Sequence, residues 1–157
     1  MATITATLAP AHGSSSRGRQ PYMVEQTIDL TANSIAPGDV VQAITVPANT
    51  KIMAAGLQVT ASATQNTGTD ATAILGTAVD DNEYVAAFDI DGAADGAYAP
   101  SATVAGDVVI TSADTLDVTL AGGGASFTAG TLRVYAVMMD VSALGEMTAD
   151  EVSRDSA

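Results

Sequence analysis

Cysteine is absent from this 157-residue chain, and histidine occurs once, as His12. Without cysteine the chain has neither a disulfide framework nor thiolate metal ligands. A Ser-His-Asp or Cys-His arrangement would have to be built on that single histidine, which lies in a polar N-terminal segment. We therefore expect a protein that is not an enzyme and that needs no cofactor.

Basic residues are also scarce. The chain has 5 Lys and Arg against 18 Asp and Glu, a formal net charge of -13, and Lys51 is its only lysine. Such a surface repels nucleic acid and anionic membranes, so we expect neither as a partner. Neither a membrane-spanning apolar run nor the basic start of a signal peptide is present, which predicts synthesis in a cytoplasm without export.

Aromatic residues make up 4% of the chain and tryptophan is missing, although 47% of the residues are hydrophobic. The apolar content is mainly alanine, valine and isoleucine, with many threonines. Small and β-branched side chains of this kind suit thin packed sheets better than a helical bundle. The length suits one domain with a modest core.

Apolar and polar residues alternate with period two over short stretches that are separated by turn residues. Strands are predicted at 22–30, 39–46, 51–63, 71–79, 84–90, 106–110, 115–120 and 131–140. In the turn after Val46, Pro47 restricts one dihedral angle and Asn49 tolerates a positive φ. The pattern predicts an all-β fold, an antiparallel β-sandwich that is jelly-roll-like, with Greek-key sandwiches of other strand order left open.

The last two predicted strands indicate which faces are buried. Alternation assigns these residues to the core: Val118, Leu120, Leu132, Val134 and Ala136. Arg133 and Tyr135 then share the opposite face. The sequence "AVMM" interrupts the alternation, and burial on two sides there would indicate a subunit contact. The candidate self-association residues are Tyr135, Val137, Met138 and Met139.

The chain divides into an N-terminal arm at 1–21, a sandwich at 22–141 and an acidic C-terminal tail at 142–157. The arm contains Arg17 and Arg19 and no acid up to residue 20. It is either a disordered terminus or a basic arm that lies on a partner. In the tail, Thr148 and Glu151 have the spacing of a capping box, with room for about two helical turns.

Asp89, Asp91 and Asp95 raise the question of a metal site. An EF-hand that starts at Asp89 would have Ala93 at its fifth position and Pro100 at its twelfth, so the motif fails. A non-standard calcium site remains open for these aspartates, as it does for "DDNE" at 80–83. Asp89 and Asp91 share a strand face at about 6 to 7 Å, as an acid pair would, but without an aromatic sugar platform. We interpret this stretch as a strand end that runs into an exposed loop.

The body of the chain resembles small β-sandwich proteins of tailed-bacteriophage virions, such as head decoration (cement) proteins. The resemblance covers residues 39–141 and is carried by "DVVQAITVPANTKIMAAGLQVTASA", "TAILGTAVDDNEYVAAFDI" and "TSADTLDVTLAGGGASFTAGTLRVYAVMMDV". It implies a non-enzymatic structural protein, often a homotrimer, that binds the major capsid protein on the outer surface of the capsid and stabilises it.

With that resemblance, Arg17 and Arg19 become candidate capsid contacts, because a basic arm can lie on an acidic surface. An alternative is a head-fibre or tail-associated adhesive module that binds a receptor. Such a module is expected to gather aromatic side chains in one cluster of loops.

Overall fold

The protein was described from a computed structural model, and the description covers residues 20–32, 35–100 and 109–141. All strands in these ranges belong to two antiparallel sheets, and no α-helix occurs in them. The all-β sandwich prediction is therefore confirmed. Arg17, Arg19 and the tail at 142–157 lie outside the described residues.

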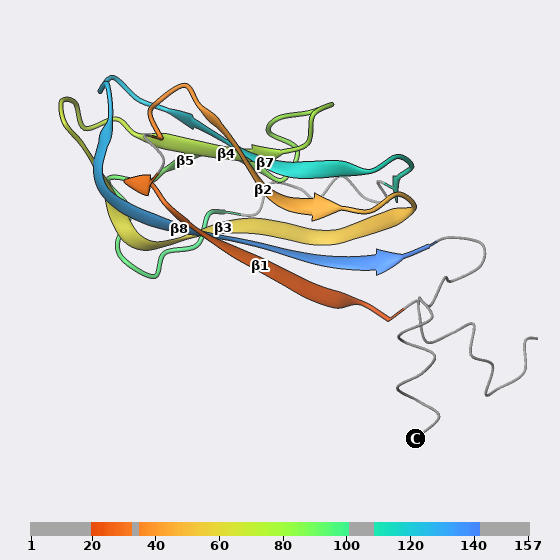
Figure 1. The fold of residues 1–157 in the computed structure, drawn as a ribbon. Coiled ribbons are helices and arrows are strands. Elements are labelled where there is room, and N and C mark those ends of the chain that lie inside the picture. Colours follow the sequence, from red (N-terminus) through yellow and green to blue (C-terminus); the bar gives the residue numbers. More distant parts are fainter. Residues whose placement is uncertain (1–19, 33–34, 101–108, 142–157) are drawn as a thin grey trace, which may run out of the picture.

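One sheet has the strand order β1-β8-β3-β6 and the other β2-β7-β4-β5 (Figure 1). The strands of the first sheet are β1 (Tyr22–Asp29), β8 (Phe127–Asp140), β3 (Thr50–Gln65) and β6 (Val109–Ile110). Those of the second are β2 (Val40–Val46), β7 (Asp114–Ala121), β4 (Thr72–Gly76) and β5 (Val85–Asp89). In Figure 1 the two sheets lie as layers, with β1 running along the free margin of the first.

The pairing follows a simple scheme. The first strand pairs with the last, β2 with β7, β3 with β6 and β4 with β5, all antiparallel. Two further pairs, β3 with β8 and β4 with β7, join these hairpin-like pairs into sheets. The chain thus has the connectivity of one long antiparallel ribbon that is wrapped into two layers.

The core lies between the layers and is built mainly from Leu, Val, Ile and Ala. The buried residues that alternation assigned to the last two strands are all confirmed: Val118, Leu120, Leu132, Val134 and Ala136. The inner faces of both sheets therefore supply the core, as period-two patterning requires.

Local backbone features agree with two details of the sequence. Asn49 has φ of 58° in the turn between β2 and β3, as expected for the residue that allows the left-handed conformation there. Gly130 has φ of 131°, and a Cβ on it would lie 2.7 Å from Cα of Ala63. Glycine is therefore required where β8 crosses closest to β3.

The start of β8 differs from the prediction. The stretch 121–130 was expected to be a loop, but β8 already begins at Phe127, which pairs with Gln65. The extra length follows from β3, whose register shifts keep it beside β8 over 16 residues. In the part of the chain that is described, no helix is long and apolar enough to cross a membrane.

Candidate functional site

The outer face of the β1-β8-β3-β6 sheet is the face turned away from the other sheet, and it carries the odd-numbered residues of β8 from Thr131 to Met139. The antiparallel register places three cross-strand rows on it. The rows are Met23–Val137–Ala54, Glu25–Tyr135–Gly56 and Thr27–Arg133–Gln58. The predicted placement of Arg133 and Tyr135 on one face, opposite the core residues, is confirmed. Alternation in the sequence of β8 identified Arg133 and Tyr135, and the pairing of β8 with β1 and β3 identifies the other members of these rows.

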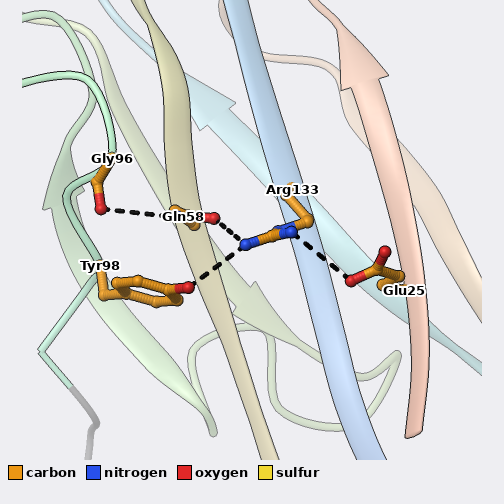
Figure 2. A network of polar contacts seen from close by, with 5 residues as sticks. All are labelled: Glu25, Gln58, Gly96, Tyr98 and Arg133. Carbon is orange, nitrogen blue, oxygen red and sulfur yellow. Dashed lines mark hydrogen bonds and ion pairs between the residues drawn. The ribbon is translucent and has the colours of Figure 1, made fainter.

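Arg133 is the centre of a polar network on this face (Figure 2). Its Nη2 donates to Oε1 of Gln58 and, at 3.2 Å, to the hydroxyl of Tyr98. Its Nη1 lies 3.7 Å from Oε2 of Glu25, so the guanidinium reaches partners on both neighbouring strands. Gln58 in turn donates from Nε2 to the carbonyl of Gly96 at 3.1 Å. The planar donors of arginine thus join β8, β1, β3 and the 91–99 loop.

The loop that carries Tyr98 lies along the free edge of β3 beyond its pairing with β6. The amide of Val59 donates to the carbonyl of Ala97, and the amide of Ala99 donates to that of Leu57, each at 2.9 Å. Tyr98 forms an isolated antiparallel bridge with Gln58. The loop was expected to be an exposed acidic loop. Instead its second half acts as an extra edge segment of the sheet, because β3 is long enough to pair with it.

Two tyrosines meet above β3. The rings of Tyr98 and Tyr135 lie edge to face, with centroids 6.0 Å apart and an interplanar angle of 73°. Tyr135 covers Gly56, since a Cβ on that glycine would lie 2.7 Å from Cζ of the ring. A glycine inside an apolar strand marks a bulge or a close approach, and at Gly56 the structure shows the close approach.

Apolar side chains continue this face beyond the network. Met23 is 61% exposed, Tyr98 55% and Met53, at the β3 register shift, 42%. Val137 and Met139 on β8 are half-buried. Methionine, tyrosine and arginine are the residue types enriched in the cores of protein–protein contacts, where most charged residues are depleted. The face is chemically suited to bind another protein surface.

Met138 does not belong to this face. It is fully buried and pairs with Ile52 on the inner side of the sheet. Alternation continues through the "AVMM" sequence, so Ala136 and Met138 point inward while Val137 and Met139 point outward. The inclusion of Met138 among the self-association residues was therefore wrong. The error came from taking four apolar residues in a row as a change of pattern.

Each of the three aspartates accepts a hydrogen bond from a backbone amide, Asp89 from within the 89–97 region and the other two from neighbouring segments. Asp89 Oδ1 accepts from the amide of Gly92 at 2.7 Å, and this hydrogen bond, with a second interaction with Asp91, lowers the pKa of Asp89. Asp91 Oδ2 accepts from the amide of Ala71 at 3.1 Å. Asp95 Oδ1 accepts from the amide of Ser62 on β3 at 2.8 Å.

These contacts fasten the loop to the ends of β3 and β4. Phe88 and Ile90 are buried while Asp89 is exposed, as predicted for a strand end. No group of three or more His, Cys, Asp or Glu side chains with the arrangement of a metal site occurs among the described residues, the turn at 80–83 included.

A cleft of about 560 Å³ lies where the 77–83 turn faces residues 109–114. Val79, Val109 and Ile110 form its apolar wall, and Asp80, Glu83 and Asp114 contribute carboxylates. Burial is the main cause that raises the pKa of Glu83. The described residues that line the cleft are acids, Thr and Ser hydroxyls and apolar groups, and none of them is a histidine or a cysteine.

No protein-family model matches the chain, and no curated protein matches it. Solved structures do share its fold. A chain described as "Cyanophage Pam1 capsid asymmetric unit" has a TM-score of 0.61 and 19% identity, covering 86% of this chain and 93% of that one. A chain of "Capsid of Ralstonia phage GP4" has a TM-score of 0.60 and 20% identity, covering 88% and 93%.

A third chain, from "Acidic stable capsid structure of Helicobacter pylori bacteriophage KHP30", has a TM-score of 0.50 and 16% identity, covering 78% of this chain and 93% of that one. At these identities the likeness shows a shared fold. It extends over nearly the whole length of each neighbour, so the two-sheet sandwich is similar as a unit.

Proposed function

We propose that this protein is a non-enzymatic structural component of a phage virion. In this proposal it is a decoration (cement) protein that binds the major capsid protein on the outer surface of the capsid and stabilises it. The fold is similar to chains in three phage capsid structures, which supports a structural role in the virion. Strand β1 pairs with β8, β2 with β7, β3 with β6 and β4 with β5. This pairing supports a jelly roll, a fold common in viral capsid domains.

The composition of the outer face is the observation that carries the proposal. Its central charges, Arg133 and Glu25, lie 3.7 Å apart, and Tyr135, Met23, Val137 and Ala54 lie in the row of Glu25 and the row beside it. Covering such a face with another protein surface is favourable, because apolar area is removed from water and no unpaired charge is buried. We therefore assign self-association into a homotrimer to Tyr135, Val137 and Met139.

The basic arm completes the proposal. The described part of the chain contains Lys51 and Arg133 as its only cations beside many carboxylates, so an acidic capsid surface would repel it. Arg17 and Arg19 offset that repulsion if they lie on the major capsid protein. Several weak contacts for each trimer then add up through multivalent attachment.

The self-association test changes one apolar residue at a time to aspartate. Val137→Asp lies in the apolar row of the outer face, whereas Val79→Asp lies at a position that is 93% exposed on the 77–83 turn. Light scattering on a sizing column should give three times the 15.6 kDa chain mass for the wild type and Val79→Asp, and a smaller mass for Val137→Asp. A trimer in which Val137→Asp has no effect would place the contact elsewhere, and a monomeric wild type would contradict the trimer.

Capsid attachment is tested separately by co-sedimentation with heads that lack the protein. We expect removal of residues 1–20 to leave a folded sandwich that binds heads more weakly. Arg17→Ala with Arg19→Ala should cause part of that loss, and the loss should be larger at low salt because exposed charges are then less screened. Arg154→Ala serves as the matched control. Full binding by the truncated protein would move the capsid contact to other residues.

One observation favours a second candidate, the adhesive module on a head fibre or tail. Tyr98 from the 91–99 loop and Tyr135 from β8 lie beside Arg133, with Glu25 and Gln58 as further polar groups, and this aromatic and polar grouping suits a receptor site. Under this alternative, Tyr98→Ala abolishes attachment to host cells and leaves binding to heads unchanged. The decoration proposal expects no attachment of the isolated protein to cells.

A further inference from the structure

Among the described residues, β1 is an edge strand that no other element covers, and of the features that usually protect an edge it has only the charges of Glu25 and Asp29. It contains eight residues, and its register with β8 runs from Tyr22–Met138 to Asp29–Thr131 without a shift. The other edges differ: β6 has two residues, β5 has five, and β2 has a register shift after Gln42. A long, regular edge free of bulge, proline and lysine presents alternate N–H and C=O groups ready to pair with another strand.

A groove runs beside this edge between the two layers. Its volume is about 320 Å³, and β1 and β2, the edges of the two sheets, form its sides. Ile28, Val41 and Ala43 supply apolar surface, and Gln26 and Gln42 are exposed polar residues in its lining. A strand added to β1 would place every second side chain over this groove.

The sequence contains a segment that matches both features. Residues 2–8, "ATITATL", alternate without exception: Ala2, Ile4, Ala6 and Leu8 are apolar, and the residues between them are threonines. The segment is uncharged, has high β-propensity and ends two residues before Pro10. Its length is close to that of β1, so one added strand would satisfy nearly the whole edge.

We propose that residues 2–8 of the same chain add to the free edge of β1 as an antiparallel strand. The alternate apolar residues, Ile4 among them, then lie over the groove, and the threonines lie on the opposite side. The connection from Leu8 to Tyr22 can span about 46 Å, whereas β1 is about 27 Å long, so the chain reaches its own edge. A tether of this length holds the segment at a millimolar effective concentration at its own edge.

This pairing also explains a feature of β1. Its inward-facing residues Tyr22 and Gln26 are exposed although their partners on β8, Met138 and Val134, are fully buried. The first sheet therefore extends past the second along β1. An additional strand there covers inward-facing side chains of β1 that the second sheet does not reach.

Residue-resolved amide exchange of the full chain tests the proposal. The β1 amides that point away from β8 should exchange at least about tenfold more slowly in the wild type than in Ile4→Asp, because a buried charge expels the added strand. Thr5→Asp is the matched control, since its side chain would face solvent, and it should retain the slow exchange. The β1 amides bonded to β8 report in each variant that the sandwich is folded. Equal, fast exchange of the outward amides in all three proteins would overturn the proposal.

A mixing experiment identifies the source of the strand. An isotope-labelled chain that lacks residues 1–9 is mixed with an excess of unlabelled full chain. We expect the labelled β1 amides to remain fast, because each full chain uses its own segment. Slow exchange that appears on mixing would show that a second copy supplies the strand and would overturn the assignment to the same chain.

Discussion

The two faces of β8 differ in what they require of their side chains. Leu132, Val134 and Met138 on the inner face are fully buried against the other sheet. Arg133 and Tyr135, on the outer face, alternate with them and contact named polar or aromatic partners. The side chains on one face of β8 therefore fill the core, and those on the other face make specific polar and aromatic contacts.

This difference teaches where substitutions act. On the inner face, close packing between the layers makes each removed methylene costly whatever its chemical detail. On the outer face, stability depends less on any residue, and the arrangement of donors, rings and exposed methionines decides what can bind. Stability and recognition can therefore be measured separately along a single strand.

The largest effect is expected from Leu132→Ala. The side chain is fully buried, so its truncation removes apolar contacts and leaves a cavity, at a cost of about 3 kcal/mol in the free energy of unfolding. Val137→Ala on the outer face should cost less than about 1 kcal/mol, since that side chain is half-buried. Denaturant titration of both variants checks this, and equal losses would contradict the distinction between the faces.

The second-largest effect is expected at Gly56, where the outer face has no room for a side chain. Gly56→Ala should lower the free energy of unfolding by about 1–3 kcal/mol, because the new methyl group collides with the ring of Tyr135. The same substitution in a Tyr135→Ala background should cost much less. The double-mutant cycle isolates this clash, and an unchanged cost in that background would show that the ring is not its cause.

A smaller effect is expected from the polar network. Arg133→Met keeps much of the apolar stem and removes the hydrogen bonds to Gln58 and Tyr98, for a loss of about 1 kcal/mol. Glu25→Gln, which removes only the 3.7 Å ion pair at a partly exposed site, should cost less than about 0.5 kcal/mol. Thermal melts at matched salt rank the two variants, and a larger loss for Glu25→Gln would make the ion pair the main interaction.

The smallest effect lies outside both faces, at the start of the 91–99 loop. The amide of Gly92 lowers the pKa of Asp89 below its ordinary value of 3.8. The resulting stabilisation is present above that value and is lost as the pH falls through the lower folded pKa. Below pH 3.8 the unfolding free energy of the wild type should therefore fall more steeply than that of Asp89→Asn. If the unfolding free energies of the two proteins fall equally with pH, the ionisation of Asp89 does not contribute to stability.

Several features of the outer face could be predicted from the sequence, and the reasons are local. The shared face of Arg133 and Tyr135 follows from the two-residue period of a strand, and the importance of Gly56 follows from a glycine inside an apolar strand. The contacts to Glu25, Gln58 and Tyr98 could not be predicted, because they depend on the register between strands that are distant in sequence. Met138 was misassigned because a run of four apolar residues conceals a period that only the opposite sheet makes visible.

The sequence by itself determined that this protein is built from short antiparallel strands with a small-residue core, because alternation and turn residues act over a few neighbours. It also determined that Val118, Leu120, Leu132, Val134 and Ala136 of β7 and β8 are buried. Only the tertiary structure decided that the 91–99 loop pairs with β3, that Tyr98 and Tyr135 meet beside Arg133, and that β1 is an edge of its sheet. Each of these depends on how segments that are distant in sequence align, and alignment is set by packing between the layers, which no local pattern encodes.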